Sequence, residues 1–265
     1  MININGKTKL FGVLADPIDH VKAPEIYNER WLNRKKNFLM VPIHVKPRNL
    51  SFVIEGLRSI SNFFGFCVTL PHKVEVAKLC NHLNPNAEMI GAVNVAYFNK
   101  KRELIGDNFD GEGFVAGLIG EGYSIENKNF FIYGAGGAAR SISFALAKYK
   151  ASSLTLSNRT FNNAKKLSDL VHKWFPNLII NLSNNCSNCD VIINTSSVGL
   201  NEKDKISIDI KNASEDALIT DIIMQPEMTK LLKRAKLQKH CIHLGKHMLS
   251  YQSDLMENIL TKQIL

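Results

Sequence analysis

The chain has 265 residues, of which 45% are hydrophobic and 22% charged, as is ordinary for a globular protein. No apolar run approaches the roughly 20 residues that a membrane-spanning helix needs. The formal net charge of +9 could attract nucleic acid, but the lysines are spread along the chain and no nucleic-acid-binding motif is recognisable. We therefore expect one large or two modest globular domains, with neither a nucleic acid nor a membrane as partner.

The N-terminal residues and the five cysteines favour a cytoplasmic protein. Residues 1–7 lack the charged-then-apolar pattern of a secretion signal. Cys186 and Cys189 have the spacing of metal ligands, but no second Cys or His pair accompanies them. We expect free thiols in a reducing compartment and no bound metal.

The first part of the chain alternates strand-like with helix-like segments. Pro24 suits the first position of a helix, and Pro71 ends a strand. The pattern predicts strands over 9–15, 38–45, 65–70 and 91–98, and helices over 24–35, 50–60 and 72–80. Such alternation is typical of an α/β fold with a mostly parallel sheet covered on both faces.

A glycine-rich segment follows at the middle of the chain. The apolar run 130–133 leads into Gly-Ala-Gly-Gly-Ala-Ala and then into a helix-like segment, 141–148. Gly134 permits a tight turn, Gly136 lets the backbone approach a pyrophosphate, and Ala139 allows close helix–strand packing. The pyrophosphate would lie at the helix N-terminus. The segment predicts a dinucleotide-binding domain in second place, after about 130 residues that suffice for a substrate domain.

The end of the next predicted strand, 154–157, indicates which dinucleotide binds. An NAD-preferring fold would place Asp or Glu there to hold the ribose 2′-hydroxyl, but Asn158-Arg159-Thr160 contains no acid. A guanidinium can pair with a 2′-phosphate and stack on adenine. The segment favours NADP, the alternative being that Arg159 is a solvated loop cation. Strands over 190–194 and 218–223 and helices over 228–235 and 248–260 complete the chain.

Three further segments place polar residues where strands end. Thr69 and Lys73 follow the strand stopped by Pro71, Asn94 follows Gly-Ala-Val, and the glycines of 106–114 suit a tight loop that holds Asp110 at a domain junction. A lysine can take the proton of an alcohol while hydride leaves carbon, and a carboxylate can orient it. Taken singly, each residue could instead be a solvated Lys, a turn Asn or a capping Asp.

Together these segments resemble the shikimate dehydrogenase family in order and spacing. The resemblance covers essentially the whole chain, through 16–24, 68–73, 91–94, 106–114, 134–140, 158–160, 194–199, 221–223 and 245–252. It implies an α/β fold of two domains: an N-terminal substrate domain with a mostly parallel sheet (1–106 and 243–265) and a Rossmann-type NADP-binding domain (107–242). A C-terminal helix would return to the first domain, and a cleft between the domains would close on substrate.

The resemblance also implies an activity and a set of site residues. The activity is NADP-dependent, reversible reduction of 3-dehydroshikimate to shikimate, or of a related cyclic ketone, by a monomer or homodimer in aromatic amino acid (chorismate) biosynthesis. Lys73 and Asp110 match the family's catalytic pair. The positions that match its substrate pocket are Val21, Ala23, Cys67, Thr69, Asn94, Met224 and Gln252. The positions that match its cofactor site are Gly134, Ala135, Gly136, Gly137, Ala138, Asn158, Arg159, Thr160, Thr195, Gly245 and Met248.

Several pocket positions depart from the family pattern. The family has Ser where Val21 and Ala23 stand and Tyr where Met224 stands, and those hydroxyls bind the carboxylate of shikimate. At the position of Cys67 the family has Asn, which helps to hold the ring hydroxyls of the substrate. The departures imply a related cyclic alcohol that lacks this carboxylate or presents it elsewhere, unless Lys22 or a backbone amide rebuilds the clamp.

Two further positions depart from the family pattern, and one alternative function remains. Asn163 stands where a second basic residue often supports 2′-phosphate binding, and Phe109 replaces a usual Thr beside Asp110. A non-catalytic NADP(H)-binding regulator is the alternative from another functional class. Retention of both Lys73 and Asp110 argues against it, because a pure binder needs no proton-transfer pair.

Overall fold

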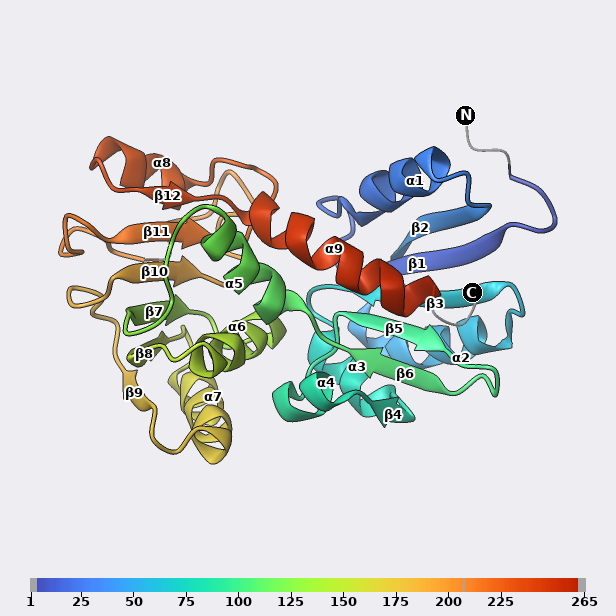
Figure 1. Ribbon diagram of the computed structural model, residues 1–265, viewed down its shortest axis with the longest axis horizontal. Helices are drawn as coiled ribbons and strands as arrows, with labels where there is room; N and C mark the ends of the chain where they lie inside the picture. Colours follow the sequence, from blue (N-terminus) through green and yellow to red (C-terminus); the bar gives the residue numbers. More distant parts are fainter. Residues whose placement is uncertain (1–3, 207, 262–265) are drawn as a thin grey trace. The chain divides into compact units, whose positions relative to one another are not determined.

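The computed structural model describes residues 4–206 and 208–261. The chain forms two compact units (Figure 1): the first takes its described residues from Met1–Phe109 and Ser253–Leu265, and the second is Asp110–Gln252. The resemblance implied divisions at 106/107 and 242/243. The expectation that residues 1–7 are not a secretion signal rests partly on residues 1–3, which lie outside the described residues. Within the described part of the chain, no helix combines the length and apolar character needed to cross a membrane.

The first unit is built on a six-stranded sheet in the order β2-β1-β3-β5-β6-β4. The strands are β1 Lys9–Ala15, β2 Phe38–His44, β3 Phe63–Val68, β4 His82–Leu83, β5 Val95–Phe98 and β6 Leu104–Asp107. Strand β5 runs antiparallel to both its neighbours, β3 and β6, while the other pairings are parallel. The mostly parallel sheet is therefore confirmed, and its reversed strand brings the amino end of β5 to the edge where β3 and β6 end.

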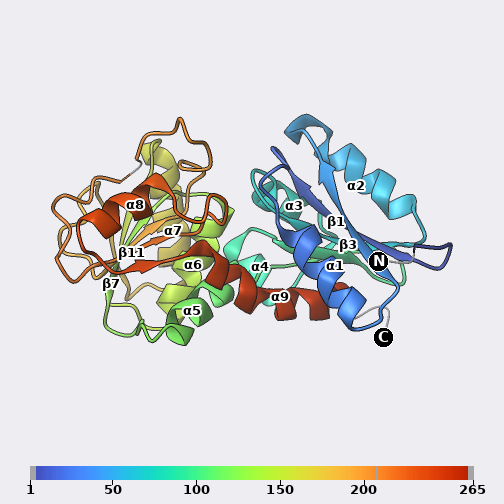
Figure 2. The same cartoon turned by 90° about the horizontal axis from the view of Figure 1, so that it is seen from above.

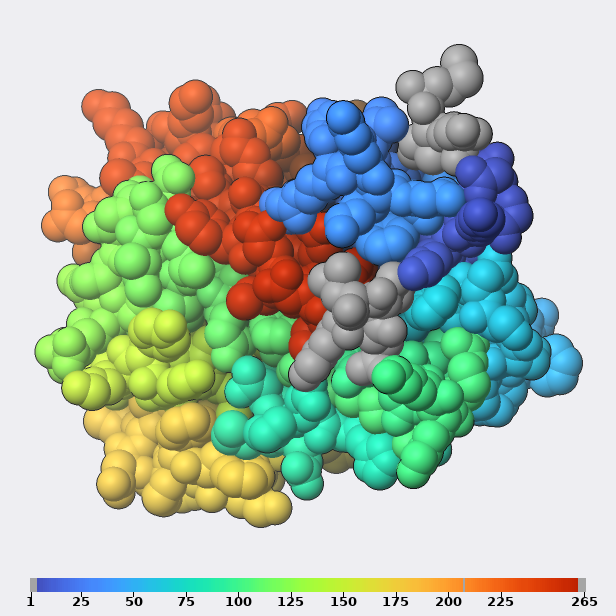
Figure 3. All heavy atoms as spheres, turned by 45° about the vertical axis from the view of Figure 1, so that its right-hand side comes forward, coloured from blue at the N-terminus to red at the C-terminus, as the bar shows by residue number. Residues whose placement is uncertain are grey.

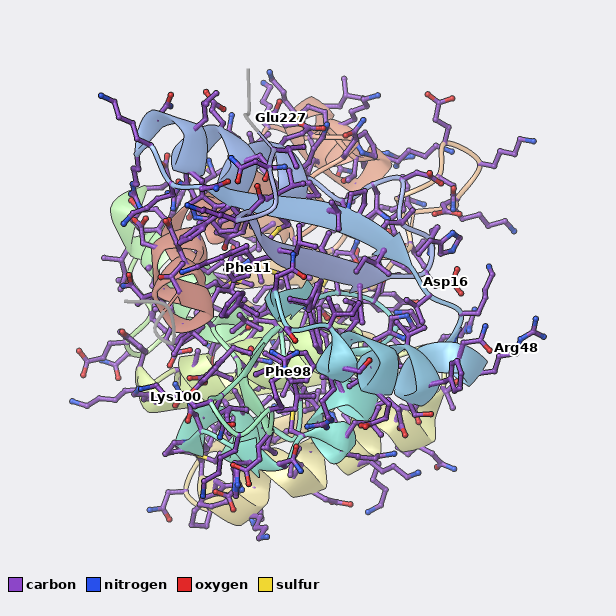
Figure 4. The ribbon with its side chains drawn as sticks, turned by 90° about the vertical axis from the view of Figure 1, so that its right-hand side faces the viewer. Phe11, Asp16, Arg48, Phe98, Lys100 and Glu227 are labelled. Carbon is purple, nitrogen blue, oxygen red and sulfur yellow. The ribbon has the colours of Figure 1, made fainter. Side chains whose placement is uncertain are left out.

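Helices cover both faces of this sheet, as the alternating pattern predicted (Figure 2). They are α1 Ala23–Asn33, α2 Leu50–Ser59, α3 Lys73–Leu79, α4 Pro85–Ile90 and the last turns of α9 Gly245–Thr261, with a 3-10 turn at Pro47–Asn49. Strand β1 sends Leu14 into a core cluster with α2 and α3, and it sends Phe11 into a second cluster with α1 and α9 (Figure 4). Each face buries one of these clusters.

A buried carboxylate fastens α9 to α1 within the first unit. Glu257 accepts hydrogen bonds from Trp31 Nε1 at 3.0 Å and from Arg34 Nη1 at 2.8 Å. Tyr27 donates its hydroxyl to the Ser253 carbonyl at 3.3 Å. Because these bonds join residues more than 220 positions apart, the end of the chain completes a core begun near its start, and Figure 3 shows the surfaces of the two helices side by side.

The second unit carries a fully parallel six-stranded sheet in the order β12-β11-β10-β7-β8-β9. Its strands are β7 Asn129–Tyr133, β8 Ser153–Ser157, β9 Ile179–Leu182, β10 Val191–Asn194, β11 Leu218–Asp221 and β12 Ile242–His243. Its helices are α5 Asp110–Gly120, α6 Gly137–Lys148, α7 Phe161–Trp174, α8 Lys230–Leu237 and the first turns of α9. Counted from β7, this is the strand order of a dinucleotide-binding Rossmann fold, so the predicted fold is confirmed.

The segment 106–114 was expected to be a tight loop, and this was wrong. Strand β6 ends at Asp107, and helix α5 begins at Asp110. The glycines serve helix packing: a Cβ on Gly111 would lie 2.7 Å from the Ala145 Cβ of α6, and a Cβ on Gly113 would lie 2.7 Å from the Met248 carbonyl oxygen of α9.

Other element boundaries also differ from the prediction. The strand expected over 91–98 begins at Val95, because α4 occupies the chain up to Ile90 and its C-cap, Gly91, is left-handed (φ +66°). The strand expected over 65–70 runs from Phe63 to Val68, and the one over 218–223 ends at Asp221. Helices α4, α5 and α7 and strands β4, β6, β9 and β12 were not predicted.

Candidate functional site

The carboxyl edge of the first unit's sheet gathers three predicted site residues. Asn94 precedes β5 and lies between the ends of β3 and β6: the Val68 N–H donates to its carbonyl at 2.7 Å, and its own N–H donates to the Asp107 carbonyl at 3.0 Å. Thr69 directly follows β3. Lys73 begins α3, and its carbonyl accepts the Val93 N–H at 2.8 Å. The structure therefore brings Thr69, Lys73 and Asn94 to one edge, where parallel α/β sheets bind ligands.

Buried amides fix the loops at this edge. The Asn94 side chain is buried and accepts the Phe109 N–H at 3.1 Å. Asn108 is also buried and donates from Nδ2 to the Ala92 carbonyl at 3.0 Å. Asn84 Nδ2 donates to Asp107 at 2.7 Å, and burial raises the pKa of the Asp107 carboxyl. The loops before β5 and after β6 are held in one arrangement as a result.

A charged cluster that was not predicted lies at the ends of β1 and β2. Asp16 Oδ1 lies 2.7 Å from His44 Nε2 and 3.0 Å from Lys46 Nζ. Hydrogen bonds from His44 and then Lys46 lower the pKa of the Asp16 carboxyl. The parallel register pairs Ala15 with His44, which brings the three side chains together. The sequence places polar residues at the ends of both strands. Predicting that they meet would have required knowing that β1 pairs with β2.

The departures from the family pattern in the first unit share one apolar environment. Ala23 and Cys67 are buried in the core cluster that contains Phe11. Val21 and Phe109 are partly buried and pack against the same cluster. These four positions, where the family has Ser, Ser, Asn and Thr, therefore lie among apolar side chains. None of the four residues has a hydroxyl that could bind a carboxylate.

The glycine turn of the second unit is built around Gly134, directly after β7. Gly134 has φ +123°, and a Cβ there would lie 2.4 Å from Thr195 Oγ1. Thr195, after β10, donates to the Tyr133 carbonyl from both its N–H and its Oγ1, each at 2.8 Å. The Gly134 N–H donates to the Ser157 carbonyl at 2.8 Å. The turn thus lies where the strand order reverses from β8 to β10, the point at which such sheets bind nucleotides.

The start of α6 fits a pyrophosphate. Gly136 precedes the helix, and a Cβ built on it would meet nothing within 4 Å, so there is open space beside it. Helix α6 begins at Gly137 and buries Ala139 against the unit, leaving Ala135 and Ala138 partly exposed. The N–H groups of the first helical turn have no partner inside the helix and favour an anion.

The segment between β8 and α7 fits a 2′-phosphate. Arg159 and Thr160 are exposed, and Asn158 Nδ2 donates to the Thr160 carbonyl at 2.9 Å. Within residues 4–206 and 208–261, the Arg159 guanidinium takes part in no hydrogen bond or ion pair of the protein. A cation with uncommitted donors stands where an NAD-specific protein would have an acid.

A buried carboxylate joins the loops after β10 and β11. Asp221 has no solvent exposure and accepts hydrogen bonds from Asn194 Nδ2 at 3.1 Å, Thr229 Oγ1 at 2.8 Å and the Ile223 N–H at 3.0 Å. Burial raises the pKa of Asp221 to about 6. Asp221 lies in the segment 221–223 that carries part of the family resemblance, but nothing in that segment predicted its burial or its three hydrogen bonds.

The other predicted residues of the second unit lie on α5, α9 and the loop after β11. Gly245 begins α9, and a Cβ there would lie 2.6 Å from the Ile223 carbonyl oxygen. Met248 and Gln252 of α9 are buried, and Met224 is partly buried. Asp110 is buried at the start of α5. The structure places Asp110, Met224, Gln252 and the cofactor residues in the second unit, and it places Val21, Ala23, Cys67, Thr69, Lys73 and Asn94 in the first.

The raised pKa of Asp221 predicts a pH-dependent contribution to stability. The folded state keeps the proton up to about pH 6, whereas the unfolded chain releases it near pH 4. The free energy of unfolding therefore falls as pH rises through this window, by up to ~3 kcal/mol. We expect the difference in unfolding free energy between wild type and D221N, from urea titrations, to fall by this order between about pH 4 and pH 7. A difference that is constant or rises with pH would contradict the assignment, and D169N, at an exposed carboxylate of α7, is the control.

Comparison with known proteins gives one consistent family. The family model described as the shikimate dehydrogenase substrate binding domain matches residues 13–96. The shikimate dehydrogenase (NADP(+)) of Alkaliphilus oremlandii is 36% identical over 245 residues, which are 88% of this chain and 84% of the relative. A crystal structure of a shikimate dehydrogenase with NADP+ has a TM-score of 0.89 at 32% identity, covering 98% of this chain and 92% of that one. The ligand-free 5-ketofructose reductase of Gluconobacter sp. has a TM-score of 0.81 at 26% identity, covering 97% and 94%. The chain belongs to the shikimate dehydrogenase family.

Proposed function

We propose that the protein is an NADP-dependent oxidoreductase that reversibly reduces 3-dehydroshikimate to shikimate, or a related cyclic ketone to its alcohol. The observation that carries this proposal is the glycine turn at Gly134, with open space beside Gly136 and an uncommitted Arg159, in a chain similar over most of its length to NADP-dependent shikimate dehydrogenases. Gly134, Ala135, Gly136, Gly137 and Ala138 would hold the pyrophosphate, and Asn158, Arg159 and Thr160 the 2′-phosphate. Thr195, Gly245 and Met248 would complete the cofactor site.

Lys73 and Asp110 are the proposed proton-transfer pair. NADPH, when bound, supplies the hydride that reaches the carbonyl carbon. Lys73 donates a proton to the carbonyl oxygen as hydride arrives, and in the oxidative direction it takes the hydroxyl proton back. Asp110 orients the lysine ammonium. The position of Lys73 beside the buried Asn94 loop supports its role, because a fixed backbone limits where the ammonium can reach.

The remaining pocket residues are proposed to bind the ring of the substrate. Thr69 and Asn94 at the carboxyl edge, together with Gln252 on α9, can hydrogen-bond ring hydroxyls. We also propose that the protein acts in the cytoplasm as a monomer or homodimer. Its five cysteines, none of which forms a disulfide within the described residues, support a reducing compartment.

A second candidate function is reduction of a cyclic ketone without a carboxylate. The packing of Val21, Ala23, Cys67 and Phe109 against one apolar cluster favours this substrate class. Lys22, the alternative cation for this carboxylate, is paired with Glu25 at 3.0 Å (Nζ to Oε1). The similarity to a 5-ketofructose reductase, an enzyme named for a ketose without a carboxylate, also supports it.

Replacement of Lys73 tests the catalytic proposal. We expect Lys73→Ala to lower kcat by about 10²–10⁴, the usual range for a lost acid–base group. Steady-state kinetics with NADPH and the best ketone substrate measure this. Lys78→Ala, which removes an exposed lysine of the same helix, is the matched control and should keep normal turnover. Near-normal turnover in Lys73→Ala would mean that Lys73 only packs or positions.

Replacement of Arg159 tests the choice of cofactor. A charge-assisted guanidinium–phosphate pair is worth roughly 1.5–3 kcal/mol, which corresponds to about 10- to 150-fold in affinity. We expect NADP+ to bind more tightly than NAD+ by this factor, and Arg159→Ala to lose most of the difference. Calorimetric titration with both nucleotides measures it, with Lys165→Ala of α7 as control. Equal affinity of the wild type for NAD+ and NADP+ would refute the assignment.

Substrate kinetics separate the two candidate functions. Val21, Ala23 and Met224 cannot donate hydrogen bonds to a carboxylate, and each such bond is worth roughly 1.5–3 kcal/mol. Two lost bonds, partly offset by water, would weaken shikimate binding by about 10²- to 10³-fold. We therefore expect a millimolar KM for shikimate, a lower KM for a cyclic polyol without a carboxylate, and a lower shikimate KM in the triple variant V21S/A23S/M224Y. A micromolar shikimate KM with ordinary kcat would support the first candidate instead.

A further inference from the structure

We propose that Asp221 is a positioning residue for NADP(H), which it holds in place through the loops after β10 and β11 rather than by contact. This inference rests on the NADP binding proposed above, and it adds a residue that lies outside the set implied by the family resemblance. Asp221 ends β11 in the second unit and is buried without solvent exposure.

Three donors converge on the two oxygens of this carboxylate. Oδ2 accepts from Asn194 Nδ2 at 3.1 Å and from Thr229 Oγ1 at 2.8 Å. Oδ1 accepts the Ile223 N–H at 3.0 Å. The donors come from the end of β10, the start of α8 and the loop after β11, so Asp221 ties three segments together.

Asp221 also decides which way the Asn194 side chain faces. Asn194 Nδ2 points to the carboxylate and donates to the Val198 carbonyl as well, at 3.0 Å. Its Oδ1 is thereby turned to Ser196, whose N–H and Oγ donate to it at 3.1 and 2.7 Å. The conformation of the loop from Ser196 to Val198 thus depends on an amide that the carboxylate orients.

The segments fixed in this way touch the proposed cofactor site at two places. Thr195, next to Asn194, contacts the glycine turn so closely that a Cβ on Gly134 would lie 2.4 Å from its Oγ1. The second place is the start of α9, where the Ile223 carbonyl packs against Gly245. A Cβ on Gly245 would lie 2.6 Å from that carbonyl oxygen. A shift of Asp221 therefore reaches the Gly134 turn and the first turn of α9 together.

An amide cannot replace this carboxylate. The amide of D221N has one accepting oxygen and one donating NH₂ group. If the oxygen faces Asn194 and Thr229, the NH₂ group opposes the Ile223 N–H. If it faces Ile223, the NH₂ group opposes Asn194 Nδ2. Either orientation leaves donors facing each other in a buried site, so one of the two loops must move.

The experiment compares D221N with a matched variant at the other end of β10. Asp190 precedes that strand and accepts the Asn129 N–H at 2.8 Å, so D190N also loses a carboxylate that caps a loop, but at the amino edge of the sheet. NADPH binding is measured by calorimetry, and kcat and KM are measured with saturating ketone. We expect D221N to raise the Kd and KM for NADPH at least 10-fold, with kcat at saturating NADPH within about 3-fold of wild type. D190N should keep the wild-type Kd.

The outcomes separate this inference from the proposed function. A wild-type protein that binds no NADPH overturns the proposed function, and the inference with it. Wild-type binding that D221N retains unchanged overturns the inference alone, as does an equal loss in D190N, which would indicate general destabilisation. If D221N does not fold, Thr229→Val removes one donor to Asp221, while Thr229→Ser keeps it. A raised Kd in Thr229→Val that Thr229→Ser restores supports the inference, and equal Kd values in both overturn it.

Discussion

A parallel sheet gathers the carboxyl ends of its strands along one edge, and the proposed chemistry of both units depends on this constraint. In the second unit that edge places the turn at Gly134 between Ser157 and Thr195, where the strand order reverses. The first unit adds a reversed strand, β5, whose amino end reaches the same edge. Backbone hydrogen bonds therefore hold Asn94 between two strand ends, and its side chain accepts the Phe109 N–H from the loop after β6.

Much of the fold was predictable because local signals agreed with it. Prolines, glycines and alternating apolar runs marked most strands and helices of the first unit and the start of the nucleotide-binding unit. Helix α7 was missed although its buried residues, Ala164, Leu167 and Val171, recur at helical spacing. The glycines of 106–114 were misread because the same residue serves a tight loop or a close helix contact. Only the positions of α6 and α9 decide between them.

The site was predictable where one short segment carries the whole arrangement, and not where distant segments meet. The turn at Gly134 and the strand end at Thr69 each lie within a few residues. By contrast, Asp16 meets His44 across 28 residues, and Asn194 meets Asp221 across 27. Those contacts follow from which strands are neighbours. A carboxylate at a strand end looks the same in sequence whether it is partly exposed, like Asp16 after β1, or buried with three donors, like Asp221.

The fastening of α9 to α1 has a consequence for synthesis of the chain. The core cluster around Phe11 and Trp31 needs Met256 and Leu260, and the Trp31 indole needs Glu257, yet the whole second unit is translated in between. At about 5–20 residues per second, the first unit waits roughly 8–30 s for these side chains. During that interval its aromatic face is uncovered on the ribosome. Removal of the last turns of α9 would likewise leave the finished chain without the side chains that cover this face.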